Sequence, residues 1–151
     1  MIIKSLDHLN QISKTISKKL KNGDCIFLIG EIGVGKTTLA RYLINNLQNQ
    51  KGLKETEVLS PTFNLLYEYE IKDLKIMHYD LYRIKKASEL DHLGIFSEIK
   101  KTVKIVEWPD LIKTPLINKL EIRLEYGEND NERKMMIRGS TSKWRDFENE
   151  V

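Results

Sequence analysis

Residues 24–37 read DCIFLIGEIGVGKT, and the architecture of the rest of the chain can be built outward from this run. Its first seven residues are mostly apolar, include β-branched and aromatic side chains and lack a helical period. This predicts a strand over 24–30 that is buried on both faces. The residues that follow place Leu39, Leu43 and Leu47 at helical spacing. The predicted order is therefore strand, glycine-rich loop and helix.

The loop residues 30–37, GEIGVGKT, match the pattern G-x-x-x-x-G-K-[ST] in full, between a strand and a helix as the pattern requires. Its glycines let successive backbone amides turn inward and approach phosphate oxygens, and the helix adds the positive end of its dipole. Lys36 can place a cation on the outer phosphates, and Thr37 can offer a hydroxyl to Mg²⁺. The predicted triphosphate site consists of Gly30, Glu31, Ile32, Gly33, Val34, Gly35, Lys36, Thr37 and Thr38.

The other segments predict a mixed sheet. Apolar residues at helical spacing predict a helix over 6–20, and Trp144 with Phe147 predicts a short C-terminal helix packed on the sheet. Polar turns at 72–73 and 127–132 separate strand-like runs and predict antiparallel pairs. The strand-like runs are 58–59, 65–71, 75–81, 103–108, 120–126 and 134–138. The fold class is α/β: a P-loop NTPase-like mixed sheet with a parallel nucleotide-binding core, antiparallel additions and flanking helices.

Composition limits the class of protein. The 151 residues are 40% hydrophobic and 31% charged, which predicts one folded domain over 1–151. No apolar run approaches the roughly 20 residues of a membrane span, and no secretory signal opens the chain, so we expect a cytoplasmic protein without a membrane partner. The net charge of +3 is too small to indicate nucleic-acid binding. The single cysteine, Cys25, is expected to be a buried packing residue.

A phosphate loop also needs an acidic residue at the end of another parallel strand, to hold Mg²⁺ directly or through water. Two residues qualify by position: Asp80 ends the run KIMHYD, and Glu107 ends KIVE. The residues alone leave both open. Because His78 and Asp80 share one face of a strand, His78 is expected to orient the Asp80 carboxylate, although a purely structural histidine is equally consistent.

Two other classes of P-loop protein can be weighed. A GTPase is disfavoured because DHLG at 91–94 follows a helical stretch rather than a strand, and NKLE at 118–121 carries glutamate where aspartate is required. A small-molecule kinase is the stronger alternative, since it too is a compact P-loop domain. Kinases of this kind close a basic lid over the phosphates, whereas the six arginines of this chain are spread out. The kinase remains the alternative function.

Three further segments, read in order with the phosphate loop, carry a family resemblance. SPTF at 60–63, HYDLYR at 78–83 and VEWP at 106–109 resemble elements of the TsaE (YjeE) family, at that family's spacing. The resemblance covers residues 24–110. It implies a bacterial ATPase that is required to make threonylcarbamoyladenosine on tRNA.

The resemblance also implies roles for individual residues. Glu107 and Thr37 would ligate Mg²⁺, Asp80 would be catalytic, and Lys36 would stabilise the developing charge on ATP. Thr62 would sense the γ-phosphate, with a plain turn as the alternative, and Trp108 is a usual family residue that could equally be a packing aromatic. The segment around Ser5 and Leu6 would lie near the adenine.

The partners that the resemblance implies are the transferase TsaD and its companion TsaB. Hydrolysis would reset their complex rather than form the carbamoyl adduct, and contact with tRNA would be indirect, through that complex. A short chain with no separate substrate domain is consistent with such dependence.

Overall fold

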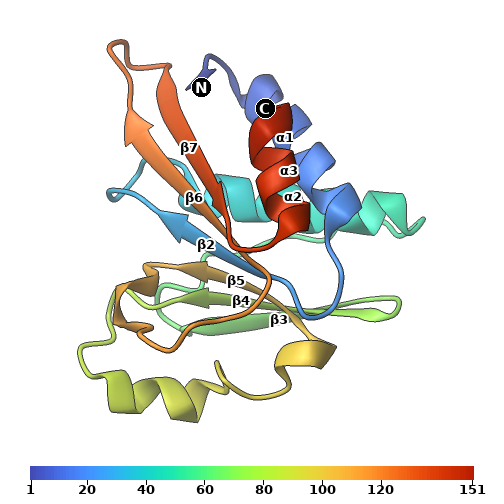
Figure 1. Cartoon of the computed structure of the whole chain (residues 1–151), viewed down its shortest axis with the longest axis vertical. Helices are drawn as coiled ribbons and strands as arrows, with labels where there is room; N and C mark the ends of the chain where they lie inside the picture. The colour runs from blue at the N-terminus through green and yellow to red at the C-terminus, as the bar shows by residue number, and fades with distance from the viewer.

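The computed structural model describes residues 1–151, and a seven-stranded mixed sheet in the order β1-β7-β6-β2-β5-β4-β3 forms its centre (Figure 1). The parallel core consists of β6 (Lys119–Tyr126), β2 (Cys25–Ile29), β5 (Val103–Glu107) and β4 (Leu74–Asp80). Antiparallel strands extend it on both sides, namely β3 (Leu66–Ile71), β7 (Arg133–Gly139) and β1 (Ile2–Ile3). The predicted fold class is confirmed, with both antiparallel pairs at the expected turns.

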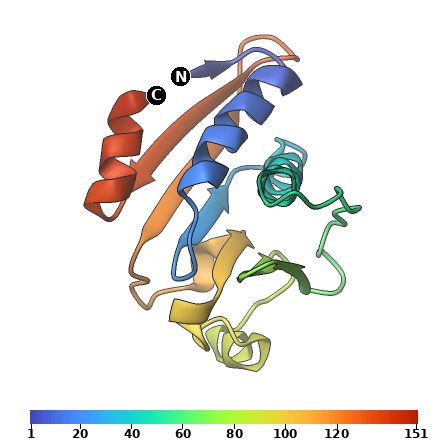
Figure 2. The ribbon, with the colours of Figure 1, turned by 90° about the vertical axis from the view of Figure 1, so that its right-hand side faces the viewer.

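Three helices gather on one side of this sheet, as Figures 1 and 2 show. They are α1 (Leu6–Lys19), α2 (Lys36–Gln50) and α3 (Ser142–Glu150). The Ser5 side chain caps α1 by accepting a hydrogen bond from the His8 amide, which satisfies one of the free donors of the first turn. Trp144 and Phe147 of α3 are fully buried in the main core, as their spacing predicted.

The opposite side of the sheet is covered by three 3₁₀ segments, Ala87–Leu93, Ile99–Lys101 and Pro109–Leu111. Successive side chains of a strand point to opposite faces, so β2 sends Ile26 and Leu28 into the main core and Cys25 and Phe27 into the second one. This confirms that the strand is buried on both faces. Burial raises the pKa of the Cys25 thiol to about 12, as expected for a packing residue.

Some sequence predictions were wrong in detail. The segment 58–59 is not a strand, because residues 53–60 form a loop that pairs with no strand of the sheet. Leu65 and Trp108 lie just outside the strands that were expected to include them, and both have positive φ angles, 67° and 57°. The left-handed backbone turns the chain out of the sheet at these two points. The short strand β1 and the three 3₁₀ segments were not predicted.

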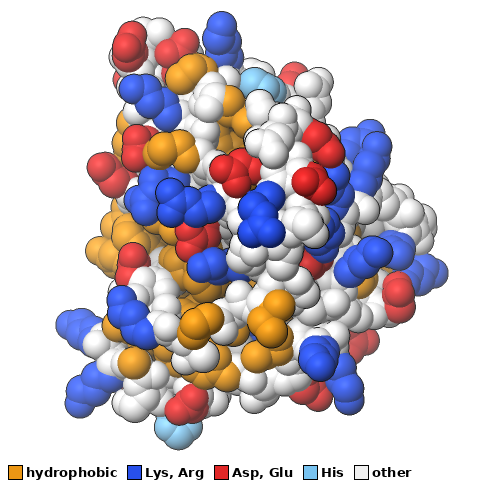
Figure 3. All heavy atoms as spheres, in the orientation of Figure 1, with side chains coloured by type: hydrophobic (Ala, Val, Ile, Leu, Met, Phe, Trp, Pro, Cys, Tyr) orange, Lys and Arg blue, Asp and Glu red, His pale blue; other side chains and the backbone are white.

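The exterior carries both signs of charge. On the face shown in Figure 3, Lys and Arg side chains alternate with Asp and Glu, without a continuous basic surface. None of the helices has the length and apolar character that crossing a bilayer requires.

Contact between β7 and α3 leaves no space for a side chain at Gly139. A Cβ built there would lie 2.3 Å from the Trp144 carbonyl carbon and 2.5 Å from the Arg145 amide nitrogen. We therefore expect Gly139→Ala to lower the free energy of unfolding by about 2 to 3 kcal/mol, because backbone must move to admit the methyl group. Chemical denaturation measures this, with the exposed neighbour Arg138→Ala as control. Equal stability of the two variants would contradict the packing described here.

Candidate active site

The two candidate acids lie side by side at one edge of the sheet. Asp80 ends β4 and Glu107 ends β5, and the two residues are paired in the register of these parallel strands. Both are buried, at 4% and 2% exposure. The next strand, β2, runs parallel to β5 and leads directly into the loop 30–35. Because the carboxyl ends of parallel strands meet at the same edge, both carboxylates face the loop and the start of α2.

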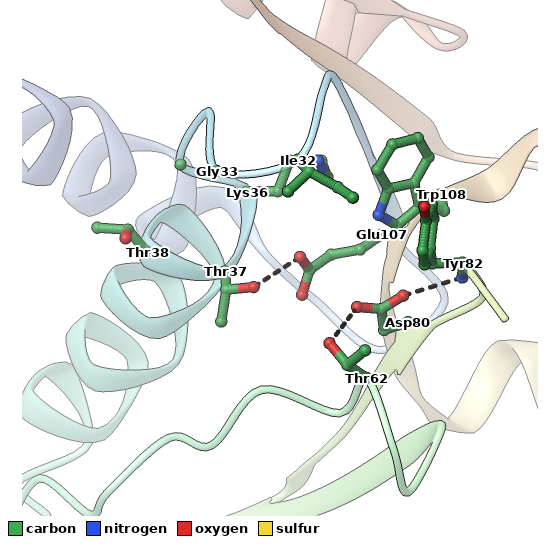
Figure 4. A pocket seen from close by; sticks show the side chains of 11 residues that line it. Ile32, Gly33, Lys36, Thr37, Thr38, Thr62, Asp80, Tyr82, Glu107 and Trp108 are labelled. Atoms are coloured by element: carbon green, nitrogen blue, oxygen red, sulfur yellow. Dashed lines mark hydrogen bonds between the residues drawn. The ribbon is translucent and has the colours of Figure 1, made fainter.

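Glu107 is held by both of its oxygens. Its Oε1 accepts a hydrogen bond of 2.8 Å from the Thr37 hydroxyl, which lies in the first turn of α2 (Figure 4). Its Oε2 lies 2.7 Å from Nε2 of His78, which is fully buried. Since a carboxylate only accepts hydrogen bonds, Nε2 is the donor. The expectation that His78 orients Asp80 was therefore wrong.

The strand order explains this correction. His78 and Asp80 do share a face of β4, as the alternation of side chains requires. That face also includes Glu107 from the neighbouring strand β5, and the histidine reaches across to it. The other ring nitrogen, Nδ1, is buried without a partner, so Glu107 is the only polar group that fixes the orientation of the ring.

Asp80 is held by a different segment. Its Oδ2 accepts a hydrogen bond of 3.0 Å from Thr62, and its Oδ1 accepts one of 2.9 Å from the backbone amide of Tyr82. The Thr62 hydroxyl lies 2.8 Å from that of Ser60. The loop 51–65 is thus tied to Asp80 at two points, by the Thr62 hydroxyl and by the Leu65 carbonyl, which accepts a hydrogen bond of 3.1 Å from the Asp80 amide.

Lys36, the first residue of α2, folds back over the loop. Its Nζ donates to the carbonyls of Gly30 and Glu31, at 2.6 and 2.7 Å, and lies 4.2 Å from the centroid of the Trp108 ring. Burial lowers the pKa of the Lys36 ammonium, and the negative charges of Glu107 and Asp80 oppose this shift. The carboxylates therefore help to keep a buried cation charged beside the loop.

Two aromatic side chains, Tyr82 and Trp108, line one side of the site. The rings of Tyr82 and Trp108 lie 4.8 Å apart, tilted by 47°, and stand next to Lys36 and Ile32 in Figure 4. The positive φ of Trp108 turns the chain away from β5 and presents its indole to the site. Tyr82 was not among the predicted site residues, although it stands within the run HYDLYR that drew attention to Asp80.

These residues surround a cavity of about 310 Å³. Its lining consists of Ile32, Gly33, Gly35, Lys36, Thr37, Thr38, Thr62, Asp80, Tyr82, Glu107 and Trp108. Of the other predicted loop residues, Val34 is buried beneath the loop, whereas Gly30 and Glu31 border a second hollow next to β6. No arginine lines this cavity, whereas Arg123 borders the hollow next to β6.

A larger cavity, about 560 Å³, adjoins the loop near the N-terminus. It is lined by the segment from Ile3 to Leu6, by Gly33 and Gly35, and by Asp130, Asn131 and Arg133 of the β6–β7 hairpin. Sequence reasoning drew attention to Ser5 and Leu6 through the family resemblance alone, and it missed the turn. Residues 127–132 carry only turn chemistry, so no signal in the sequence connects them with the loop.

The residues available for a metal ion are few. No group of three or more histidine, cysteine or acidic side chains is arranged to hold one. Thr37 and Glu107 provide a hydroxyl and a carboxylate oxygen that already lie within hydrogen-bond distance of each other. Mg²⁺ prefers oxygen ligands and usually takes only one or two from the protein, together with phosphates and water. This pair fits that requirement when a phosphate chain occupies the loop.

Comparison of the sequence with known proteins finds one family model and relatives that carry the same name. The family model for the threonylcarbamoyl adenosine biosynthesis protein TsaE matches residues 3–135. The tRNA threonylcarbamoyladenosine biosynthesis protein TsaE of Rickettsia felis is 32% identical over 149 residues, covering 97% of this chain and 85% of the relative. The protein of the same name from Aquifex aeolicus is 32% identical over 137 residues, covering 91% and 93%.

A solved structure shares the fold. The crystal structure of YdiB from Bacillus subtilis superposes with a TM-score of 0.73, at 25% sequence identity, covering 99% of this chain and 90% of that one.

The pairing of His78 with Glu107 can be tested by a double-mutant cycle. His78→Leu should lower the free energy of unfolding by about 2 to 4 kcal/mol, because it leaves a buried carboxylate oxygen without its donor. In the double variant with Glu107→Gln, the loss of stability should differ from the sum of the two single losses by about 1 kcal/mol or more. Chemical denaturation of the four proteins gives the coupling. His92→Leu, at an exposed histidine, is the control and should change stability by no more than about 0.5 kcal/mol. Additive losses would show that the two side chains do not interact.

Proposed function

The chain belongs to the TsaE family, and from this premise we propose that it is an ATPase of tRNA threonylcarbamoyladenosine biosynthesis, which binds Mg·ATP at residues 30–38 and hydrolyses it slowly. One observation carries the proposal: the Thr37 hydroxyl, in the first turn after the phosphate loop, is hydrogen-bonded to the buried carboxylate of Glu107. A hydroxyl and a carboxylate at this position are the protein ligands that a magnesium-bound triphosphate needs.

We assign the binding of the phosphates to the loop and to the start of α2. The first amides of a helix have no acceptor within the helix, and Thr37 and Thr38 of the first turn line the cavity. Lys36 would leave the carbonyls of Gly30 and Glu31 to reach the outer phosphates, where its charge stabilises the transition state. The hollow beside Ser5 and Leu6 adjoins the loop and is the space assigned to the adenine.

Thr37 and Glu107 would hold the magnesium ion. Bound there, the ion would neutralise charge that develops on the phosphate oxygens during hydrolysis. His78 would keep the Glu107 carboxylate turned toward Thr37, since it binds the other carboxylate oxygen. Its part in the site is positioning, because its ring does not line the cavity.

Asp80 would order the attacking water. Its carboxylate lines the cavity, and both oxygens are fixed by hydrogen bonds from the protein. In the reaction, water attacks the γ-phosphorus, the bond to the β-γ bridging oxygen breaks, and ADP and inorganic phosphate leave. The Thr62 hydroxyl donates to Asp80. If it donated to the γ-phosphate instead, this bond would break and the loop 51–65 would be free to move relative to Asp80.

The partners proposed for this ATPase are TsaD and TsaB. Each cavity beside the loop is only a few hundred Å³, which suits a nucleotide rather than a tRNA. The mixed charges visible in Figure 3 and the net charge of +3 do not favour direct tRNA binding. Contact with tRNA is therefore assigned to the complex.

The metal assignment predicts a specific loss in Glu107→Gln. This variant keeps the shape of the side chain but removes its charge, so we expect ATP binding without magnesium to be retained. The strengthening of binding by Mg²⁺ should be lost, and hydrolysis should fall by about tenfold or more. Calorimetric titration with ATP in magnesium and in EDTA measures the first effect. Glu121→Gln, on β6 and outside the cavity, is the matched control. A magnesium effect that is the same in wild type and Glu107→Gln would rule out this ligand.

The proposed activity predicts that ATP turnover depends on partners. Release of inorganic phosphate should be slow with the chain alone and faster when purified TsaD and TsaB are added. Lys36→Ala should reduce the stimulated rate by about a hundredfold, because it removes a cation from the transition state. Absence of both association and stimulation would overturn the proposal. Transfer of the γ-phosphate to a small metabolite rather than to water would establish the kinase instead.

A further inference from the structure

The β6–β7 hairpin contacts the outer side of the phosphate loop, although the sequence motifs leave it without a role. We propose that Tyr126 and Arg133, the last residue of β6 and the first of β7, are positioning residues for nucleotide binding. They hold two loop carbonyls outward, so that the amides of Gly33 and Gly35 face the phosphates. This inference rests on the proposed nucleotide function of the loop.

Two hydrogen bonds connect the hairpin with the loop. The Tyr126 hydroxyl donates to the carbonyl of Ile32 at 2.8 Å. The Arg133 Nε donates to the carbonyl of Val34 at 3.0 Å. These are alternate residues of the loop, so the hairpin fixes every second peptide plane. The hydroxyl of Tyr126 also lies close to Gly33, where an added Cβ would be only 3.2 Å away from it.

Because a peptide bond is planar, these contacts also set the directions of the Gly33 and Gly35 amides. In a planar trans peptide, the carbonyl of one residue and the N–H of the next point in opposite directions. Holding the carbonyl of Ile32 toward the hairpin therefore directs the N–H of Gly33 the other way, toward the cavity. The carbonyl of Val34 does the same for Gly35. Neither glycine amide donates a hydrogen bond within the protein, and both residues line the cavity.

The two side chains are themselves held in place. Arg133 Nη1 donates to the carbonyls of Asp130 and Glu132 within the turn, at 2.7 and 2.8 Å. Its guanidinium lies 4.6 Å from the centroid of the Tyr126 ring, a favourable cation–π distance. Two donors fixed in this way restrict the loop before a ligand arrives, which reduces the entropy that binding must overcome.

The hairpin and Lys36 form hydrogen bonds with different carbonyls of the loop. Lys36 donates to the carbonyls of Gly30 and Glu31, and the hairpin donates to those of Ile32 and Val34. Only the lysine contacts are given up if the ammonium moves to the phosphates. The hairpin contacts lie on the side of the larger cavity, which Arg133 itself lines, and they use loop carbonyls rather than the glycine amides, so they can keep the loop in shape while phosphates are bound.

The test measures ADP binding by calorimetry in the full chain, for wild type, Tyr126→Phe, Arg133→Met and Arg133→Lys. Tyr126→Phe removes a hydroxyl and keeps the ring, so ADP affinity should fall by about twofold to tenfold. Arg133→Met should cause at least the same loss. Arg133→Lys should not restore the affinity, because a lysine keeps the charge but lacks the fixed fork of donors. Tyr67→Phe and Arg138→Met are matched controls: the Tyr67 hydroxyl accepts a hydrogen bond from Asn64 rather than contacting residues 30–37, and Arg138 is exposed.

A second measurement separates positioning from general destabilisation. The ¹⁵N order parameters of the Gly33 and Gly35 amides should fall in Tyr126→Phe from values near the rigid-backbone level of about 0.85, while the melting temperature changes little. Unchanged affinity and order parameters in Tyr126→Phe and Arg133→Met would overturn the inference. Full affinity in Arg133→Lys would overturn it for Arg133, because charge alone would then suffice. If wild type fails to bind ADP, the proposed function fails, and the order parameters of the free chain still decide whether the hairpin positions the loop.

Discussion

The buried carboxylate of Glu107 is the point on which the arrangement of the site depends. It connects three elements, because its own strand β5 supplies it, α2 contacts one oxygen through Thr37, and β4 contacts the other through His78. A buried carboxylate is tolerated only when its oxygens have donors. The hydrogen bonds that make its burial possible therefore also fix the distance between the start of α2 and the end of the sheet.

Sequence reasoning predicted the part of the site that is contiguous in the chain. The loop 30–37 and its flanking strand and helix form a local unit, and each strand-end acid can be found from the run that precedes it. The partner of His78 was missed because it depends on which strand lies beside β4. That order is set by packing of the whole sheet and is not encoded in the spacing of residues 78–80.

The same reasoning explains why the hairpin was missed. Tyr126 and Arg133 are 94 and 99 residues from the loop residues that they contact and belong to no motif, so only the pairing of β6 with β2 brings them to the loop. The approach is close: a Cβ on Gly30 would lie 2.4 Å from the carbonyl oxygen of Leu124 on β6. Glycine at position 30 thus allows the loop to pack closely against β6, in addition to allowing any approach to phosphate. Strand pairing determines which side of the loop faces protein and which side faces the cavity.

The charges inside the cavity give the proposed metal a further role. Lys36, Asp80 and Glu107 all have little exposure to solvent, so one cation stands against two carboxylates at the wall of the cavity. A triphosphate would bring more negative charge to the same place, and like charges repel more strongly where the dielectric constant is low. A divalent cation held by Glu107 would reverse the sign of that interaction. The acids that would serve hydrolysis would therefore also make nucleotide binding dependent on the metal, and without it the attraction would come from Lys36 and from the amides that the hairpin is proposed to align.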